Sequence, residues 1–215
     1  MKNNLIIIGA GGLAFEIINY IHEIFESTKS KKIFFFGDAK NKKEFKKIHN
    51  NCIFIKKIPN YLKKNNTNFI IGYGNENLRN KYFKQYIKKF LPLTLVHPTA
   101  YISPSAKILD GVIVGPKSIL SPGCVIKRNV LLNSGCQIGH HAIIGESTII
   151  STGAIINGKV NVGSECFIGS NSTVMQNLKI SNLSKVTSNS ALYKNLKFNH
   201  IAHGNPAKQK KLNLN

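Results

Sequence analysis

Two adjacent histidines, His140 and His141, are the side chains of this sequence best suited to move a proton near neutral pH. A histidine can act as a general base and take the proton of an attacking amine or hydroxyl. Gly158 follows His140 by 18 residues, and a backbone amide there can stabilise the oxyanion of an acyl transfer. These residues predict an acyl-transfer site if the fold brings position 158 beside position 140. Two solvated histidines, or histidines that contact another subunit, are the alternative.

The element expected to position these residues is a six-residue repeat. Ile, Leu or Val occupies every sixth position from Val96 to Leu192, seventeen times without a slip, and the residue four places further on is mostly small. One bulky and one small inward side chain suit one side of a triangular coil, so 18 residues close a turn. The pattern predicts a parallel β-helix of about five coils, with Gly158 one coil above His140. A β-sandwich, which shows two-residue alternation, is disfavoured.

Short residues directly follow the aliphatic position in many repeats, among them Gly115, Gly139, Asn157 and Gly169. We expect the chain to bend there, because a missing or short side chain lowers the steric cost of a turn.

The first ninety residues alternate strand and helix patterns instead. A buried-type strand at residues 5–8 leads through a glycine turn, residues 9–14, into an amphipathic helix. Strands at residues 32–36 and 68–71 each end at a glycine, and a helix follows the second. This alternation predicts a small Rossmann-like α/β domain whose ligand crevice lies at the carboxyl ends of a parallel sheet. Residues 38–64, rich in Lys, are expected to form a short strand and a helix with a solvated face.

The glycine turn of this domain is suited to bind an anion, because it brings backbone amides and a helix N-terminus together. Asp38, just after the second strand, is placed to accept a hydrogen bond from a ribose or a base. A full dinucleotide fold needs two such halves, and about ninety residues provide only one. The domain therefore predicts a site for one nucleotide, with a purely structural glycine turn as the alternative.

The composition limits the classes of partner. The 215 residues are 42% hydrophobic, which suits one solenoid plus one small domain, and the formal charge is +21. Only Arg79 and Arg128 among the 30 basic residues are Arg, the residue on which specific nucleic-acid readers depend. We therefore expect no nucleic-acid partner. A basic surface would still attract anionic small ligands such as CoA or a nucleotide sugar.

The cysteines do not predict a disulfide or metal framework. Cys124, Cys136 and Cys166 occupy the small inward position of the repeat, so they are expected to fill the core, and Cys52 has no partner pattern. The N-terminal apolar run is short and ends at Glu16, unlike a signal peptide, and no stretch is long enough to span a membrane. These features predict a cytoplasmic protein without a metal ion.

With these residues placed, the chain resembles the two-domain sugar acetyltransferases of bacterial surface-glycan synthesis. This group holds UDP-4-amino-sugar N-acetyltransferases and sialic acid O-acetyltransferases. The resemblance covers nearly the whole chain and is carried by residues 5–12, 69–79, 96–106, 132–140 and 204–208. Hexad repeats are widespread among acyltransferases, whereas this N-terminal domain in front of them is specific to the group.

The resemblance implies a homotrimer, with acetyl-CoA in the cleft between neighbouring β-helices and the nucleotide sugar held by the N-terminal domain. His140 matches the general base, Gly158 the amide that faces the thioester carbonyl, and Asn133 a residue that contacts the acceptor sugar, with His141 beside that sugar. The positions that match the nucleotide-sugar site are Gly11, Gly12, Leu13, Gly37, Asp38 and Gly74. The positions assigned to acetyl-CoA are Ile149, Gly158, Ser188, Pro206 and Lys208.

Three positions depart from the family pattern. The residue after the base is commonly acidic in the amino-sugar enzymes, whereas here it is His141, so any acidic support must come from elsewhere, with Glu146 as the candidate. A second histidine that approaches the acetyl group is replaced by Ile149. The glycine-rich tract beside CoA is replaced by residues 186–191, which hold no glycine.

We predict three parts: a nucleotide-sugar-binding α/β domain at residues 1–92, a left-handed parallel β-helix at residues 93–198 and a C-terminal tail at residues 199–215. The predicted reaction is acetyl transfer from acetyl-CoA to the free amine of a UDP-linked amino sugar of the 4-amino-4,6-dideoxy type. O-acetylation of a sialic acid is one alternative; the absence of an acidic residue at position 141 favours the amine, which is the better nucleophile. A non-catalytic nucleotide-sugar-binding protein is the second alternative, which the three departures would fit.

Overall fold

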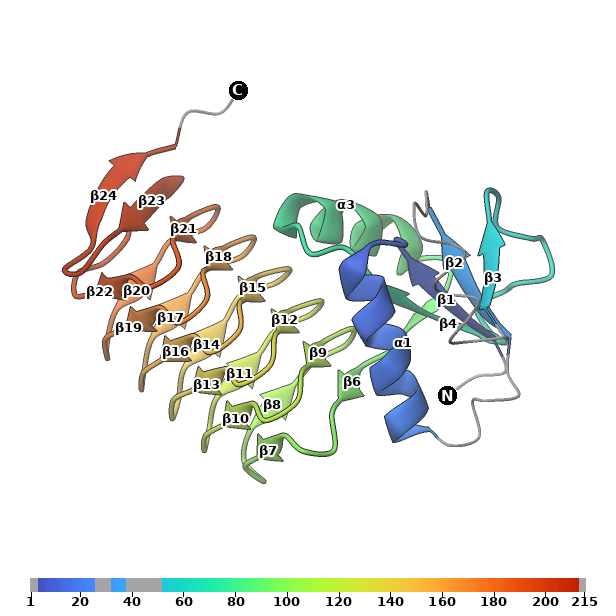
Figure 1. Cartoon of the computed structure of the whole chain (residues 1–215), viewed down its shortest axis with the longest axis horizontal. Coiled ribbons are helices and arrows are strands. Elements are labelled where there is room, and N and C mark those ends of the chain that lie inside the picture. Colours follow the sequence, from blue (N-terminus) through green and yellow to red (C-terminus); the bar gives the residue numbers. More distant parts are fainter. Residues whose placement is uncertain (1–3, 26–31, 38–51, 213–215) are drawn as a thin grey trace. The chain divides into compact units, whose positions relative to one another are not determined.

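The computed structural model describes residues 4–25, 32–37 and 52–212, and it divides into two compact units, Met1–Leu95 and Val96–Asn215 (Figure 1). The first unit is an α/β domain and the second is a β-helix.

The first unit holds a parallel five-stranded sheet with the strand order β3-β2-β1-β4-β5. The strands are β1 (Asn4–Ile8), β2 (Ile33–Phe36), β3 (Cys52–Ile55), β4 (Thr67–Ile71) and β5 (Leu91–Pro92). The three expected strands are β1, β2 and β4, and β3 is the short strand expected within residues 38–64. The edge strand β5 was not expected. The helix also expected within residues 38–64 is not found at residues 52–64, and residues 38–51 lie outside the described residues.

Two described helices, α1 (Gly12–Ile24) and α3 (Glu76–Tyr86), pack on this sheet. Phe83 of α3 shares a core cluster with Ile6 of β1, so α3 covers the face to which Ile6 points. A Cβ atom built on Gly72 would lie 2.9 Å from the Cβ of Ala14 in α1 and 3.0 Å from Cγ2 of Ile7. Because successive side chains of a strand point to opposite faces, α1 covers the face opposite α3.

The second unit is a left-handed parallel β-helix with three faces, as predicted. Face I holds β7 (Tyr101–Ile102), β10 (Ile119–Leu120), β13 (Gln137–Ile138), β16 (Ile155–Ile156), β19 (Thr173–Val174) and β22 (Ala191–Leu192). Face II holds β8 (Lys107–Ile108), β11 (Val125–Ile126), β14 (Ile143–Ile144), β17 (Asn161–Val162) and β20 (Lys179–Ile180). Face III holds β6 (Leu95–Val96), β9 (Ile113–Val114), β12 (Leu131–Leu132), β15 (Ile149–Ile150), β18 (Phe167–Ile168), β21 (Lys185–Val186), β23 (His200–His203) and β24 (Lys208–Lys211).

The coil length is 18 residues, as the repeat predicts. Gln137 pairs with Ile155 on face I and Ile143 pairs with Asn161 on face II, so position i lies beside position i+18. The aliphatic residues of the repeat and the small residues between them form one buried core. Cys124, Cys136 and Cys166 are fully buried in this core, as expected. Burial raises the pKa of the Cys136 thiol to about 12, so this thiol is neutral at physiological pH.

The tight position of each turn is three residues after the aliphatic position, not directly after it. Residues at six-residue intervals from Gly111 to Asn189 have φ between 55° and 72°. The expectation that the chain bends directly after the aliphatic position is therefore wrong. Glycine occurs there for a different reason. A Cβ atom on Gly115 would lie 2.8 Å from the backbone nitrogen of Ser134 in the next coil, so close stacking of the coils excludes a side chain there.

The residues expected to form a C-terminal tail continue the sheet of face III. Strand β23 pairs in parallel with β21, and β24 pairs antiparallel with β23. The reversal follows a turn that contains a cis peptide bond before Pro206.

Candidate functional site

His140 and His141 lie in the turn between β13 and β14, at the corner that joins face I to face II. Both side chains are exposed, and their Nδ1 atoms are 3.2 Å apart with the ring planes at 81°. This distance fits a hydrogen bond between the two imidazoles, in which one nitrogen must donate and the other accept.

Gly158 lies against the ring of His140. A Cβ atom built on Gly158 would lie 2.7 Å from Cε1 and 2.8 Å from Cδ2 of His140, and Nε2 would be closer still. The backbone also joins the two coils here, because the Lys159 amide donates to the His140 carbonyl oxygen at 2.8 Å. The 18-residue spacing thus brings the two residues together, and only glycine leaves room for the imidazole at this place.

The amide of Gly158 is available to a ligand. Its two neighbours are engaged in the β-helix, since Asn157 donates to the carbonyl of Val174 at 3.1 Å and Lys159 donates to His140. The Gly158 amide itself has no backbone acceptor within the part of the chain that the structure describes. An N–H group in this state can donate to a developing oxyanion without first breaking a bond of the fold.

Gly123 is a part of the site that sequence reasoning missed. A Cβ atom on Gly123 would lie 2.9 Å from Cδ2 of His141, so His141 covers this glycine in the preceding coil. The two histidines therefore spread in opposite directions along the corner, each over its own glycine. The signal was present in the sequence, because Gly123 precedes His141 by the same 18 residues that separate His140 from Gly158.

Glu146, the expected acidic support, lies beyond strand β14, in the turn that joins face II to face III. Within one chain the ring that contacts His140 is that of His141.

The residues expected to bind the acceptor and acetyl-CoA are not gathered around His140 in a single chain. Asn133 and Ser188 lie in turns that join face III to face I, at the other edge of face I. Ile149 is the first residue of β15 on face III, Pro206 lies in the turn after β23, and Lys208 begins β24. Of the residues assigned to acetyl-CoA, only Gly158 lies beside His140.

The residues expected to bind the nucleotide sugar gather at the carboxyl ends of β1, β2 and β4. A Cβ atom on Gly9 would lie 3.1 Å from Gly72, and one on Gly37 would lie 3.4 Å from the hydroxyl of Tyr73. Leu13 belongs to the first turn of α1. Three further glycines would place a Cβ in open space, with no atom within 4 Å: Gly11, Gly12 and Gly74. Gly9 and Gly37 have φ of +113° and +143°, which favour glycine, and Gly9 is also tightly packed against Gly72, whereas the other three glycines leave the backbone accessible. Asp38 lies outside the described residues.

Arg79 holds the loop after β4 from the inside. It is fully buried, and its Nη1 donates to the carbonyl oxygens of Ile71 at 2.9 Å and Tyr73 at 3.2 Å. Burial lowers the pKa of the guanidinium to about 9, which leaves it protonated at neutral pH. The helix that follows begins at Asn75, whose side chain accepts from the Leu78 amide at 3.0 Å. Arg79 and Asn75 thereby fix the loop that carries Gly74.

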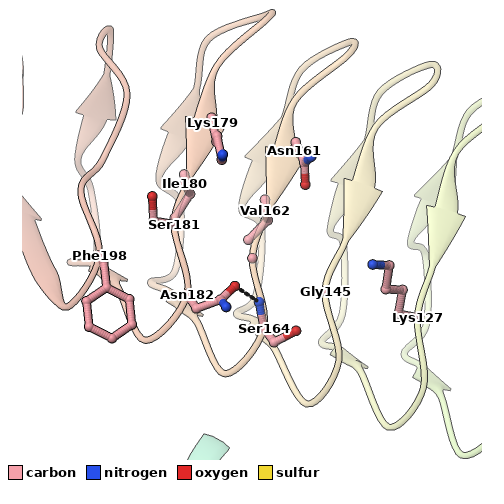
Figure 2. Close-up of a pocket in the computed structure, with 11 residues that line it drawn as sticks. Lys127, Gly145, Asn161, Val162, Ser164, Lys179, Ile180, Ser181, Asn182 and Phe198 are labelled. Carbon is pink, nitrogen blue, oxygen red and sulfur yellow. Dashed lines mark hydrogen bonds between the residues drawn. The ribbon is translucent and has the colours of Figure 1, made fainter.

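A polar pocket of about 310 Å³ opens on face II and its corner with face III (Figure 2). Lys127 and Lys179 supply two ammonium groups, and the exposed ring of Phe198 borders the pocket at the end opposite Lys127. Asn182 accepts a hydrogen bond from the Ser164 amide at 2.9 Å. The remaining lining residues are Gly145, Asn161, Val162, Gly163, Ile180 and Ser181. The charge of this pocket suits an anion, and none of the residues assigned to acetyl-CoA lines it.

No helix within the described ranges is long and apolar enough to cross a bilayer. Nor do His, Cys, Asp and Glu side chains gather there in a group of three that could hold a metal ion.

The chain is similar in fold to solved sugar acetyltransferases. The acetyltransferase domain of PglB from Neisseria gonorrhoeae FA1090 is 22% identical, with a TM-score of 0.79 over 96% of this chain and 99% of that one. A His-to-Asn mutant of perosamine N-acetyltransferase from Caulobacter crescentus, in complex with CoA and GDP-perosamine, is 20% identical, with a TM-score of 0.83 over 96% of each chain. WeeI from Acinetobacter baumannii AYE is 18% identical, with a TM-score of 0.80 over 96% of this chain and 99% of that one. These likenesses establish the shared fold.

Two family models divide the chain between them. Residues 90–202, more than half of the sequence, match the GMPPB C-terminal domain, and residues 4–86 match the PglD N-terminal domain. No curated protein sequence matches the chain. The chain therefore belongs to the GMPPB C-terminal domain family through its β-helix and carries a PglD N-terminal domain in front of it, which confirms the two-domain family that its sequence resembles.

Proposed function

We propose that this protein transfers an acetyl group from acetyl-CoA to the free amine of a UDP-linked amino sugar. The observation that carries the proposal is the corner at which the His140 ring lies over Gly158, whose amide has no backbone acceptor among the described residues. A base and an oxyanion donor on one rigid corner are the two groups that an acyl transfer needs. The fold relatives named above, an N-acetyltransferase bound to CoA and GDP-perosamine among them, support the same class of reaction.

The proposed reaction has two proton-transfer steps. The sugar amine attacks the thioester carbonyl of acetyl-CoA, and the Gly158 amide donates to the oxygen as it becomes negative. Nε2 of His140 takes a proton from the nitrogen as the new C–N bond forms. When the C–S bond breaks, the same proton passes to the departing sulfur, so the products are the N-acetyl sugar and free CoA thiol.

A homotrimer supplies the residues that one chain does not gather. The outward strand positions of face I carry no charge, and Tyr101 and Ile119, which pair in register, are 60% and 39% exposed. If three copies turn face I toward a common axis, each histidine corner meets the opposite edge of face I of the next copy. That edge carries Asn133 and Ser188, which would complete the acceptor and donor sites across the interface.

We assign the ligands of this reaction to residues of each unit separately. The accessible glycines Gly11, Gly12 and Gly74, with Leu13, Gly37 and Asp38, would hold the nucleotide sugar. The acetyl-CoA residues remain Ile149, Gly158, Ser188, Pro206 and Lys208. We add Lys127 and Lys179 of the face II pocket as candidates for the phosphates of CoA, because face II begins at the corner of His140 and provides two cations.

The activity is tested by incubating the full chain with acetyl-CoA and a panel of UDP- and GDP-linked amino sugars and sialic acids, with thiol release as the readout. We expect turnover with a UDP-linked amino sugar, reduced by about 10²-fold or more in the His140→Ala variant. Turnover with sialic acids alone would identify an O-acetyltransferase. Nucleotide-sugar binding without turnover across the panel would identify a binding protein.

The shared site is tested by co-expression of two inactive variants, His140→Ala and Asn133→Ala. In mixed trimers an interface between an intact His140 and an intact Asn133 forms by chance in about one quarter of cases, so about one quarter of the activity should return. A site confined to one chain would gain nothing from mixing.

A further inference from the structure

The side chains of His140 and His141 form a pair that is close enough for a hydrogen bond between the two rings. Their Nδ1 atoms are 3.2 Å apart, and each ring is seated over a glycine of a neighbouring coil. We infer that His141 is a positioning residue: its Nδ1 accepts a hydrogen bond from Nδ1–H of His140 and thereby leaves Nε2 of His140 unprotonated. This inference rests on the proposed function, in which Nε2 of His140 takes the proton of the amine.

The direction of this hydrogen bond decides whether His140 can act. A neutral imidazole carries one N–H, so a hydrogen bond between two Nδ1 atoms has two arrangements. If His141 donates, His140 carries its proton on Nε2, the nitrogen beside Gly158, and cannot accept another there. If His140 donates, Nε2 has a free lone pair at the side of the oxyanion donor. After proton uptake, Nδ1–H of His140 still donates to the same acceptor, so the pair serves both states.

The elements that flank the histidine pair carry few titratable groups. The flanking turns, residues 121–124 and 157–160, hold two titratable side chains, the buried thiol of Cys124 and the ammonium of Lys159. The adjoining strands β13 and β14 present Gln137 and Ile143 outward, and neither carries a charge. Lys159 stands at the same turn position as His141 one coil further on. No carboxylate stands in these flanking turns and adjoining strands.

An imidazole acceptor differs from a carboxylate in one testable respect. A carboxylate accepts a hydrogen bond throughout the range in which histidine titrates, whereas a protonated imidazole has no lone pair. A proton on His141 should therefore switch off the site just as a proton on His140 does. Either proton alone then inactivates the pair, so two groups, not one, contribute to the loss of activity as the pH falls.

Two substitutions at position 141 distinguish the role of His141 as a hydrogen-bond acceptor from its ability to take up a proton. Asn at position 141 offers Oδ1 near the place of Nδ1, tolerates positive φ and does not titrate. Leu removes the acceptor, and Leu183, with φ 59°, shows that the β-helix accommodates Leu in this backbone conformation. Lys117→Leu is the matched control, because Lys117 has φ 57° in another corner of the β-helix.

The first measurement needs no substrate. Long-range ¹H–¹⁵N NMR distinguishes a protonated from an unprotonated ring nitrogen, so it reports the tautomer of His140 directly. We expect the Nδ1–H tautomer in the unmodified protein, in His141→Asn and in Lys117→Leu, and a shift toward Nε2–H in His141→Leu. An unmodified protein with His140 protonated on Nε2 overturns the inference, whatever its activity.

The second measurement uses the acceptor sugar that the panel identifies. Residues that orient metal-bound histidines contribute about 10- to 100-fold to activity. By analogy, His141→Leu should lower kcat by about 10- to 100-fold with little change in KM. His141→Asn should retain most of the kcat of the unmodified protein. The acid limb of log kcat against pH should be steeper in the unmodified protein than in His141→Asn. Equal slopes, or an active His141→Leu, contradict the inference. Absence of turnover in every variant, with the expected tautomers, contradicts the proposed function instead.

Discussion

The β-helix and the α/β unit place their candidate sites by different means. In the β-helix a spacing of 18 residues becomes adjacency in space, so His140 lies over Gly158 and His141 over Gly123. In the α/β unit the loops after β1, β2 and β4 meet because the sheet brings their strands together, and Arg79 fixes one loop from within. A periodic fold thus confines the effect of a substitution to one corner, whereas the α/β site depends on the packing of the whole unit.

The largest effect is expected at His140. Because a substitution in the periodic β-helix affects one corner, we expect loss of function without loss of structure. His140→Ala should lower kcat/KM by about 10²- to 10⁴-fold, because a general base typically contributes that much. Its melting temperature should be unchanged, since the side chain is exposed. Thiol release and thermal unfolding measure the two quantities. His200→Ala is the control for removal of an imidazole elsewhere, and near-normal turnover of His140→Ala would falsify the assigned mechanism.

Gly158→Ala tests whether coil spacing itself builds the site. The added methyl group collides with the His140 ring, so the base must move, and we expect a loss of kcat of about 10²-fold, the lower end of the contribution of a base. Gln176→Ala places alanine at the same turn position one coil further on. This variant should be active, because alanine at this turn position does not by itself disturb the coil. If Gly158→Ala keeps its activity, the stacking of His140 on Gly158 has no catalytic importance.

Arg79→Met tests whether the site of the α/β unit depends on the packing of that whole unit. The buried carbonyl of Ile71 and the partly buried carbonyl of Tyr73 lose their donor, and a buried unsatisfied group costs about 1–3 kcal/mol. Hydrogen exchange should accelerate in β1 and β4 and remain unchanged in β13 and β16, and nucleotide-sugar affinity should fall. Arg128→Met, at an exposed corner of the β-helix, is the control. Faster exchange in both units would show that they do not respond independently.

The smallest effect is expected at the rim of the face II pocket. Lys179→Ala should raise KM for acetyl-CoA by about two- to fivefold, the range of an exposed ion pair, and the effect should shrink at high salt. Lys107→Ala, at the outward position of β8 on the same face, should leave KM unchanged. An equal effect of both substitutions would indicate attraction by net charge and not a phosphate site.

The sequence was most informative where the fold is periodic. The repeat from Val96 to Leu192 predicts the coil length, the buried cysteines and the contact of His140 with Gly158, because each depends only on counting residues. The same count would have found Gly123 under His141. It could not predict which nitrogen of one histidine meets the other, since that depends on side-chain torsions.

Other features depend on contacts that no count reveals. The edge strand β5 has two residues and forms only because it pairs with β4. The role of Arg79 follows from its burial beside two carbonyls, not from its type. Asn133 and Ser188 lie on the edge of face I away from His140, so their assigned roles require a second chain and remain predictions.

The antiparallel strand β24 bears on how a solenoid avoids polymerising. A parallel β-helix presents a row of unpaired backbone groups at its last coil, and another coil can add to such an edge in the same direction. At β24 the chain runs backwards along face III, and its exposed residues include Lys208, Lys210 and Lys211. The reversed direction breaks the template for a further coil, and the like charges repel a second copy. The four residues of β24, one of which is the proposed acetyl-CoA residue Lys208, therefore oppose fibre growth by end-to-end stacking on this face.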